Sequence, residues 1–307
     1  MIVCCGEALI DFLPRKTVEG ADSFQPFVGG SVLNVAVALG RLGVSAGFIC
    51  GLSDDFFGAM IVDALHASNV DTTLSIVSSR PTTLAFVKLT DGSAEYAFFD
   101  EGSAMRMLSE SDLPPIPAPV TALHFGSISL TAEPCGSTYE TLMRNESSDR
   151  LISLDPNIRP SLIKNREGYL ARLDRMVAMS DIIKLSREDM EWIAPGRSFE
   201  TLAEDWLARG AGLVILTQGA DGARAISKRR SVFVPSVEVD VVDTIGAGDT
   251  FSAAILAQLE TAGRLDKSAL RSLSDSELAE LLAYAARAAA ITTSRAGADP
   301  PWAREMH

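Results

Sequence analysis

The chain has 307 residues, 47% of them hydrophobic, and a formal net charge of −13. This length and apolar content suffice for a large buried core, either as one α/β domain or as one with a small appendage. The negative charge repels nucleic acid and anionic membranes, so we exclude both as partners. It also repels nucleotide phosphates, so a site for them requires local cations, backbone N–H groups or a metal ion.

Cysteine and histidine usage argues against disulfide, zinc and histidine chemistry. Neither residue type has the number or spacing of a disulfide framework or a metal site. We expect buried free thiols and structural histidines. The chain opens on an apolar strand without a basic leader and has no run of 18 uncharged apolar residues, so we expect a cytoplasmic protein. The residues are Cys4, Cys5, Cys50, Cys135, His66, His124 and His307.

Short apolar strands alternate with helical patterns along most of the chain. This order predicts an α/β fold with a doubly wound, mostly parallel sheet and helices on both faces, in a single domain over residues 1–307. Ligands of such sheets bind at the carboxyl ends of the strands. The expected strands are 2–5, 46–50, 120–125, 151–155, 181–185 and 213–217. The expected helices are 32–42, 56–67, 136–145, 169–179 and 201–208.

One region interrupts this alternation with closely spaced strands at 72–77, 82–89 and 94–99. Asp91-Gly92 is a hairpin signal between the last two. We expect a small antiparallel sheet beside the main one, formed from about 12–28 and 72–100. Two interpretations remain open: an edge hairpin without function, or a lid that excludes water from a reaction.

The most informative segment is Asp243-Thr244-Ile245-Gly246-Ala247-Gly248-Asp249, which leads into an apolar helix. Small residues at a helix start leave backbone N–H groups uncovered, where the helix dipole attracts a phosphate. Asp249 would then accept the proton of an acceptor hydroxyl. A plain turn with a helix cap is the alternative. The segment matches neither a P-loop nor a Rossmann fingerprint.

A second glycine cluster, Gly29-Gly30, precedes the first long helix, and Asn34 lies one turn into that helix. Glycines permit a ligand to approach the backbone, and an asparagine offers both a donor and an acceptor. Together with Asp11 after the first strand, Asn34 could hold vicinal sugar hydroxyls. A helix start with a polar surface residue is the alternative.

Across nearly its full length the chain resembles the PfkB-type, ribokinase-like carbohydrate kinases. The segment from Asp243 to Phe251 fits the C-terminal signature of that family, and the one from Gly29 to Gly43 is similar to the N-terminal signature, with Val32 where proline is common. Gly6-Glu7-Ala8-Leu9-Ile10-Asp11 and Asp155-Pro156-Asn157-Ile158-Arg159-Pro160 resemble bacterial fructokinases. The resemblance implies a ribokinase-like fold that binds a sugar and ATP.

The resemblance also implies roles for individual residues. Asp249 matches the catalytic base, and Gly246, Ala247 and Gly248 match an anion hole for the transferring phosphoryl group. The positions that match or are expected at the sugar are Asp11, Gly29, Gly30, Asn34, Phe98 and Arg159. Those on the nucleotide side are Lys184, Thr217, Gly219, Gly222 and Ala286.

The resemblance implies Mg²⁺ with ATP and, in some relatives, K⁺. The family's Asn-x-x-Glu segment corresponds to Ser186-Arg187-Glu188-Asp189, which departs at both ends, so Glu188 or Asp189 would act on Mg²⁺. Asp243 and the Ile245 carbonyl are the expected K⁺ ligands. Family members often dimerise through their lids, for which Thr82, Leu84, Phe86, Ile76 and Val77 supply apolar surface. The alternative is that these residues serve the protein's own core.

The acceptor is expected to be a neutral hexose, with fructose preferred. Asp100 and Glu101 follow the aromatic strand of the lid and would repel an acidic sugar, unless Arg106 or Arg159 neutralises them. A ketodeoxygluconate kinase or another sugar or nucleoside kinase is the alternative within the family. A sensor that binds sugar or nucleotide without catalysis is the alternative outside it.

Overall fold

The computed structural model describes residues 1–90 and 93–307, so the expected Asp91-Gly92 turn lies outside the described residues. Nine strands form the main sheet in the order β15-β14-β13-β12-β11-β10-β1-β4-β6. Pairing is parallel from β6 to β13 and antiparallel for β14 and β15. The strands are β1 (Ile2–Cys5), β4 (Ala46–Ile49), β6 (Val70–Asp71), β10 (Ala122–Gly126), β11 (Leu151–Asp155), β12 (Ile182–Ser186), β13 (Leu213–Thr217), β14 (Ala223–Ser227) and β15 (Arg230–Val234).

The central strands are apolar over most of their length because helices cover both faces of the sheet. Every residue of β1, β10 and β11 is buried, as parallel strands in a doubly wound sheet require. The expected fold class is therefore confirmed. The antiparallel hairpin of β14 and β15 was not predicted.

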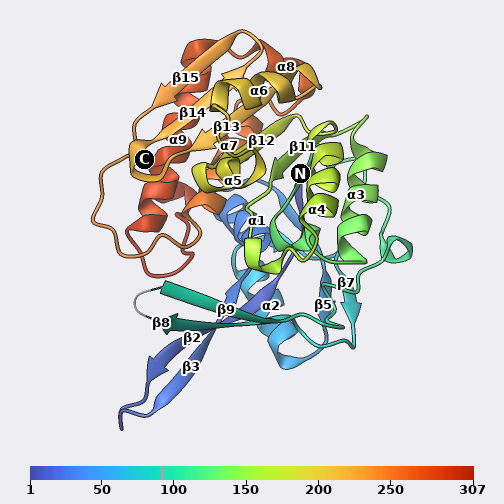
Figure 1. The fold of residues 1–307 in the computed structure, drawn as a ribbon, viewed down its shortest axis with the longest axis vertical. Coiled ribbons are helices and arrows are strands. Elements are labelled where there is room, and N and C mark those ends of the chain that lie inside the picture. Colours follow the sequence, from blue (N-terminus) through green and yellow to red (C-terminus); the bar gives the residue numbers. More distant parts are fainter. Residues whose placement is uncertain (91–92) are drawn as a thin grey trace.

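The direction of winding assigns the helices to the two faces. From β1 the chain advances to β4 and β6, whereas from β10 it advances the opposite way to β13. Right-handed crossovers therefore put α1 on one face and α3, α4 and α6 on the other. Helix α7 packs on α1, and α9 packs on α7 (Figure 1). The helices are α1 (Ser31–Arg41), α2 (Phe56–Ala67), α3 (Cys135–Glu146), α4 (Arg166–Val177), α5 (Arg187–Ile193), α6 (Phe199–Ala208), α7 (Ala247–Thr261), α8 (Lys267–Ser272) and α9 (Asp275–Thr293).

A separate four-stranded sheet projects from one end of the body, in blue and teal in Figure 1. Its order is β3-β2-β8-β9, with β2 (Leu9–Lys16), β3 (Asp22–Gly29), β8 (Leu84–Thr90) and β9 (Ser93–Phe99). Phe12 stacks on Phe86 with ring centroids 4.5 Å apart and meets the edge of Phe57 on α2. This aromatic cluster fastens the small sheet to the body.

Two details of the small sheet differ from expectation. Strand β2 pairs with β8 in parallel, so the sheet is mixed rather than antiparallel. The strand expected at 72–77 lies outside it, because β7 (Ile76–Ser78) pairs with β5 (Gly51–Ser53) in a sheet of two strands. Ile76 donates its N–H to the carbonyl of Cys50, directly after β4, which holds this segment beside the main body.

Candidate active site

Asp249 lies in the first turn of α7, at the carboxyl edge of the main sheet. The helix starts after Gly246, which has a φ of 75° and no side chain to cap the first N–H groups. Those N–H groups have no partner within the helix. Together with the helix dipole they form a place for an anion, with Asp249 beside it.

The Asp249 carboxylate is buried and held from both sides by α1. One oxygen accepts a hydrogen bond from Ser31 Oγ at 2.6 Å, and the other accepts one from Asn34 Nδ2 at 2.9 Å. Burial raises the pKa of Asp249 above its ordinary value, although these hydrogen bonds act against the rise. A carboxylate with a raised pKa is a better proton acceptor near neutral pH.

Lys184 reaches the start of α7 from β12. Its ammonium lies 2.9 Å from Asp155 Oδ2, which also accepts a hydrogen bond from Ser252 on α7. A Cβ atom added to Gly248 would lie 3.0 Å from Lys184 Nζ, so the ammonium stands against the glycine backbone. Burial lowers the pKa of Lys184, but the nearby carboxylates of Asp155 and Asp189 more than offset this. Lys184 is therefore a buried cation, not part of a surface ion pair.

The two glycines before α1 lie against acidic residues. A Cβ at Gly29 would fall 2.2 Å from Asp11 Oδ2, and Gly30, with a φ of 113°, would clash with the Glu7 carbonyl. Side chains at either position would displace Asp11 or the turn that carries Ser31 and Asn34. Burial raises the pKa of Asp11 to about 6, and the positive charge of Arg159 acts against that rise.

Three further residues, Ser31, Asn157 and Glu7, belong to the network, and their roles were not predicted from the sequence. Asn157 donates its amide to Ser31 Oγ at 2.6 Å, and Arg159 donates to Asn157 Oδ1 at 2.7 Å. Glu7, fully buried after β1, accepts the N–H of Val32 in the first turn of α1. Ser31, Asn157 and Glu7 all lie inside the motifs that resemble the family. Their position in these motifs was the one indication in the sequence that they belong to the site.

Of the residues expected on the nucleotide side, Thr217 and the two glycines after it lie at the carboxyl end of β13. Thr217 ends β13, and Gly219 (φ 57°) and Gly222 (φ 111°) shape the turn to β14. A Cβ at Gly222 would meet the Val234 carbonyl at 2.2 Å, so this glycine is required by the turn. Ala286 is buried on α9. Within the described residues, none of these four has a hydrogen bond to the Asp249 network.

Asp243 fastens the loop before α7 to the turn after α9. Its two oxygens accept the N–H groups of Ile245 at 3.0 Å and Gly297 at 2.9 Å. Asp189 is equally occupied: one oxygen accepts the N–H of Ile158 and the other accepts from Ser186 in the capping box of α5. Glu188 is exposed. The described residues contain no group of three or more His, Cys, Asp or Glu side chains suited to a metal ion.

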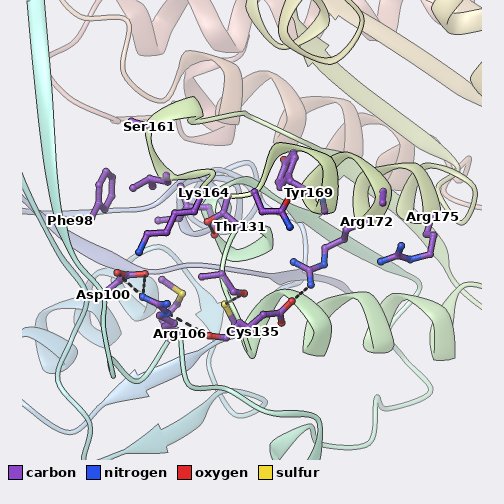
Figure 2. Close-up of a pocket in the computed structure, with 18 residues that line it drawn as sticks. Phe98, Asp100, Arg106, Thr131, Cys135, Ser161, Lys164, Tyr169, Arg172 and Arg175 are labelled. Atoms are coloured by element: carbon purple, nitrogen blue, oxygen red, sulfur yellow. Dashed lines mark hydrogen bonds and ion pairs between the residues drawn. The ribbon is translucent and has the colours of Figure 1, made fainter.

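Phe98 and Asp100, at the end of β9, line a cavity of about 610 Å³ (Figure 2). Arg106 lies in the same cavity, with Nη1 at 3.2 Å and 3.3 Å from the two Asp100 oxygens. Asp100 is thus neutralised by Arg106. Asp100 was expected to repel an acidic sugar unless an arginine neutralised it. Because Arg106 does so, that expectation is not supported.

This chain is similar to known carbohydrate kinases over most of its length. The model of the pfkB family carbohydrate kinases matches residues 1–304. A fructokinase of Rhizobium leguminosarum bv. trifolii is 51% identical over 91% of this chain and 85% of its own length. Probable fructokinase-7 of Arabidopsis thaliana is 34% identical over 98% of this chain and 89% of its own. The structure of a Xylella fastidiosa fructokinase with bound ATP has a TM-score of 0.91 at 28% identity, covering 99% of this chain and 96% of that one.

The family model and the relatives together show an enzyme that transfers a phosphoryl group to an alcohol. The chain belongs to the pfkB family of carbohydrate kinases, as its motifs indicated. ATP and a divalent metal ion follow from that membership. No helix within residues 1–90 and 93–307 is long and apolar enough to span a membrane.

The pKa of Asp11 predicts how sugar binding depends on pH. If the carboxylate accepts hydrogen bonds from sugar hydroxyls, protonation as the pH falls through about 6 removes that acceptor. We expect the dissociation constant of the sugar to rise below this pH, measured by calorimetry from pH 5 to 8. Asp11→Asn should bind weakly at every pH. A wild-type affinity that stays constant over this range would contradict the role.

Proposed function

We propose that this protein is an ATP-dependent fructokinase, which transfers the γ-phosphoryl group to a primary hydroxyl of fructose. The observation that carries the proposal is the buried Asp249 carboxylate at the start of α7, held by Ser31 and Asn34 and flanked by the ammonium of Lys184. The similarity to fructokinases over almost the whole chain supports the choice of sugar.

In the proposed mechanism, Asp249 accepts the proton of the sugar hydroxyl as its oxygen attacks the γ-phosphorus. The bond from that oxygen to phosphorus forms as the bond to the ADP oxygen breaks, in line with it. The N–H groups of Gly246, Ala247 and Gly248 stabilise the charge on the phosphoryl oxygens. Lys184 adds a positive charge at the same place, which offsets the negative field of the protein.

We propose Mg²⁺ as the divalent ion. Mg²⁺ usually binds through phosphates, water and one or two carboxylates. It therefore does not need a cluster of three or more protein ligands, and the described residues contain none. When bound, it neutralises charge on the phosphates, and Glu188 and Asp189 are the carboxylates of this chain proposed to act on it. For K⁺ we propose Asp243 and the Ile245 carbonyl, beside the turn that Gly297 closes.

We further propose one domain over residues 1–307, with the four-stranded sheet as its lid. Phe98, at the base of that sheet, would contact the sugar, so that closure of the lid excludes water from the reaction. A cytoplasmic location suits an ATP-dependent enzyme whose four cysteines are buried free thiols.

Two alternatives remain to be separated by experiment. A ketodeoxygluconate kinase would need a cation for the carboxylate, which the Asp100 and Arg106 pair does not forbid. A sensor without catalysis would have no use for a buried base held by two donors, so the Asp249 network argues against it.

Substrate selectivity tests the choice of sugar. Turnover of ATP with fructose, ribose, glucose, tagatose, ketodeoxygluconate and adenosine should give the highest kcat/KM for fructose. A higher value for ketodeoxygluconate would replace the proposed acceptor while leaving the site intact. Absence of turnover with every acceptor, despite ATP binding, would favour the sensor.

The role of Asp249 is tested by Asp249→Asn, which keeps the shape and removes the base. We expect kcat to fall by roughly 10²–10⁴-fold, with fructose binding and thermal stability little changed. Asp63→Asn, on the exposed side of α2, is the matched control and should retain wild-type turnover. Turnover of Asp249→Asn within about twofold of wild type would exclude it as the base.

We propose that the protein dimerises through the lid. Phe24 and Phe99 are 50% and 61% exposed on the aromatic cluster around Phe86, and a second lid would cover them. Of the apolar residues expected to serve here, Ile76 and Val77 lie in β7 instead, and Thr82 is buried against Asp55.

Sedimentation equilibrium should give twice the chain mass for the wild type. Phe24→Glu should shift the protein towards monomer, because it buries a charge in the proposed interface. Phe233→Glu, at an exposed site on β15, is the control and should leave the mass unchanged. A wild-type monomer at all concentrations would rule the interface out.

A further inference from the structure

The cavity beside Phe98 extends away from the Asp249 network. It runs from the end of β9 between the start of α3 and the side of α4, with a volume of about 610 Å³ (Figure 2). Within the described residues, no side chain that hydrogen-bonds to Asp249 lines it. A cavity of this size can hold a whole small molecule in addition to the sugar at Asp249.

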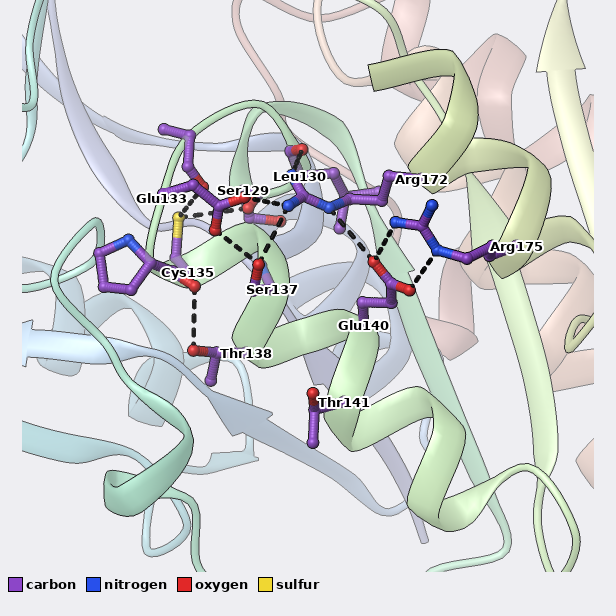
Figure 3. A network of polar contacts seen from close by, with 12 residues as sticks. Ser129, Leu130, Glu133, Cys135, Ser137, Thr138, Glu140, Thr141, Arg172 and Arg175 are labelled. Carbon is purple, nitrogen blue, oxygen red and sulfur yellow. Dashed lines mark hydrogen bonds and ion pairs between the residues drawn. The ribbon is translucent and has the colours of Figure 1, made fainter. Parts of the chain in front are cut away.

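The wall of the cavity and the groups bonded to it carry net positive charge. Arg172 donates to Glu133 and lies 3.5 Å from Glu140, and Arg175 donates to both Glu140 oxygens, at 2.7 Å and 2.9 Å (Figure 3). The cluster has five cations and three carboxylates, a surplus of two positive charges in a chain of net charge −13. Its members are Arg106, Arg144, Lys164, Arg172, Arg175, Asp100, Glu133 and Glu140.

Lys164 is an exposed residue on the wall of the cavity. Lys164 forms no ion pair or hydrogen bond with any described residue, and its side chain extends towards the Asp100 and Arg106 pair (Figure 2). An unpaired ammonium at the mouth of the cavity can bind an anionic group without first breaking an ion pair.

We propose that this cavity is an effector site for a hexose monophosphate, the class of molecule that the proposed kinase reaction releases. A phosphate monoester carries a charge of about −1.5 to −2 at neutral pH, with several acceptor oxygens, which matches the surplus of two positive charges. Lys164 and Arg106 would bind the phosphate through charge-assisted hydrogen bonds. The sugar end would extend along the cavity towards Thr131 and Asn165, away from Phe98, which the acceptor sugar is proposed to contact.

Binding of fructose 6-phosphate tests the proposal by calorimetry, with fructose and a non-hydrolysable ATP analogue present to fill the active site. We expect one equivalent to bind, more tightly than inorganic phosphate or gluconate. Lys164→Gln should weaken it about tenfold or more, as the loss of a charge-assisted hydrogen bond would. The kcat of Lys164→Gln should stay at the wild-type value.

Lys228→Gln, at an exposed site between β14 and β15, is the matched control and should bind like the wild type. Failure of fructose 6-phosphate to bind while the active site is occupied would overturn the proposal. So would equal affinity in Lys164→Gln, or equal affinity for gluconate. The proposal rests on the proposed function for the identity of the ligand, but the binding measurement needs no turnover. If the protein fails to phosphorylate fructose, the binding of fructose 6-phosphate can therefore still be measured and interpreted.

Discussion

A buried carboxylate is stable only where hydrogen bonds and positive charge compensate for lost hydration, and Asp249 imposes that requirement on the whole site. Two donors on α1 meet its oxygens, and the dipole of α7 and the ammonium of Lys184 supply positive charge. Helix α1 can bring those donors close because Gly29 and Gly30 leave room for Asp11 and Glu7. The glycine signatures and the acidic residues are therefore parts of one electrostatic arrangement.

The same arrangement explains how a strongly acidic chain can receive a nucleotide triphosphate. Lys184 is kept charged in a buried place by Asp155 and Asp189, although burial alone would favour its neutral form. The Lys184 ammonium lies next to the backbone at the start of α7, because Gly248 has no side chain to separate the two. An ammonium and the N–H groups at the start of α7 thus lie together where the phosphates are proposed to bind, in a chain whose net charge is −13.

The sheet and most helices could be predicted from sequence because periodic apolar patterns reflect local burial. Strand 151–155 and helix 56–67 agree with β11 and α2 to the residue. The pairing of strands could not be predicted. Whether residues 72–77 join the lid or pair with β5 depends on backbone hydrogen bonds to residues far away in the chain. Asp249 was found by its motif, whereas the contributions of Ser31, Asn157 and Glu7 appear only when three segments meet. The pairing of Arg106 with Asp100 likewise needed side-chain positions.

The parallel pairing of β2 with β8 has a consequence for how the protein folds. Parallel neighbours need a long crossover, and here the chain between β3 and β8 passes through α1, β4 and α2 before it returns. Half of the small sheet therefore cannot close until that part of the body is in place. Contacts between segments so distant in sequence form late and slowly, since their closure costs chain entropy first. The proposed lid is consequently not a separate folding unit, because its two halves are joined through a part of the main body.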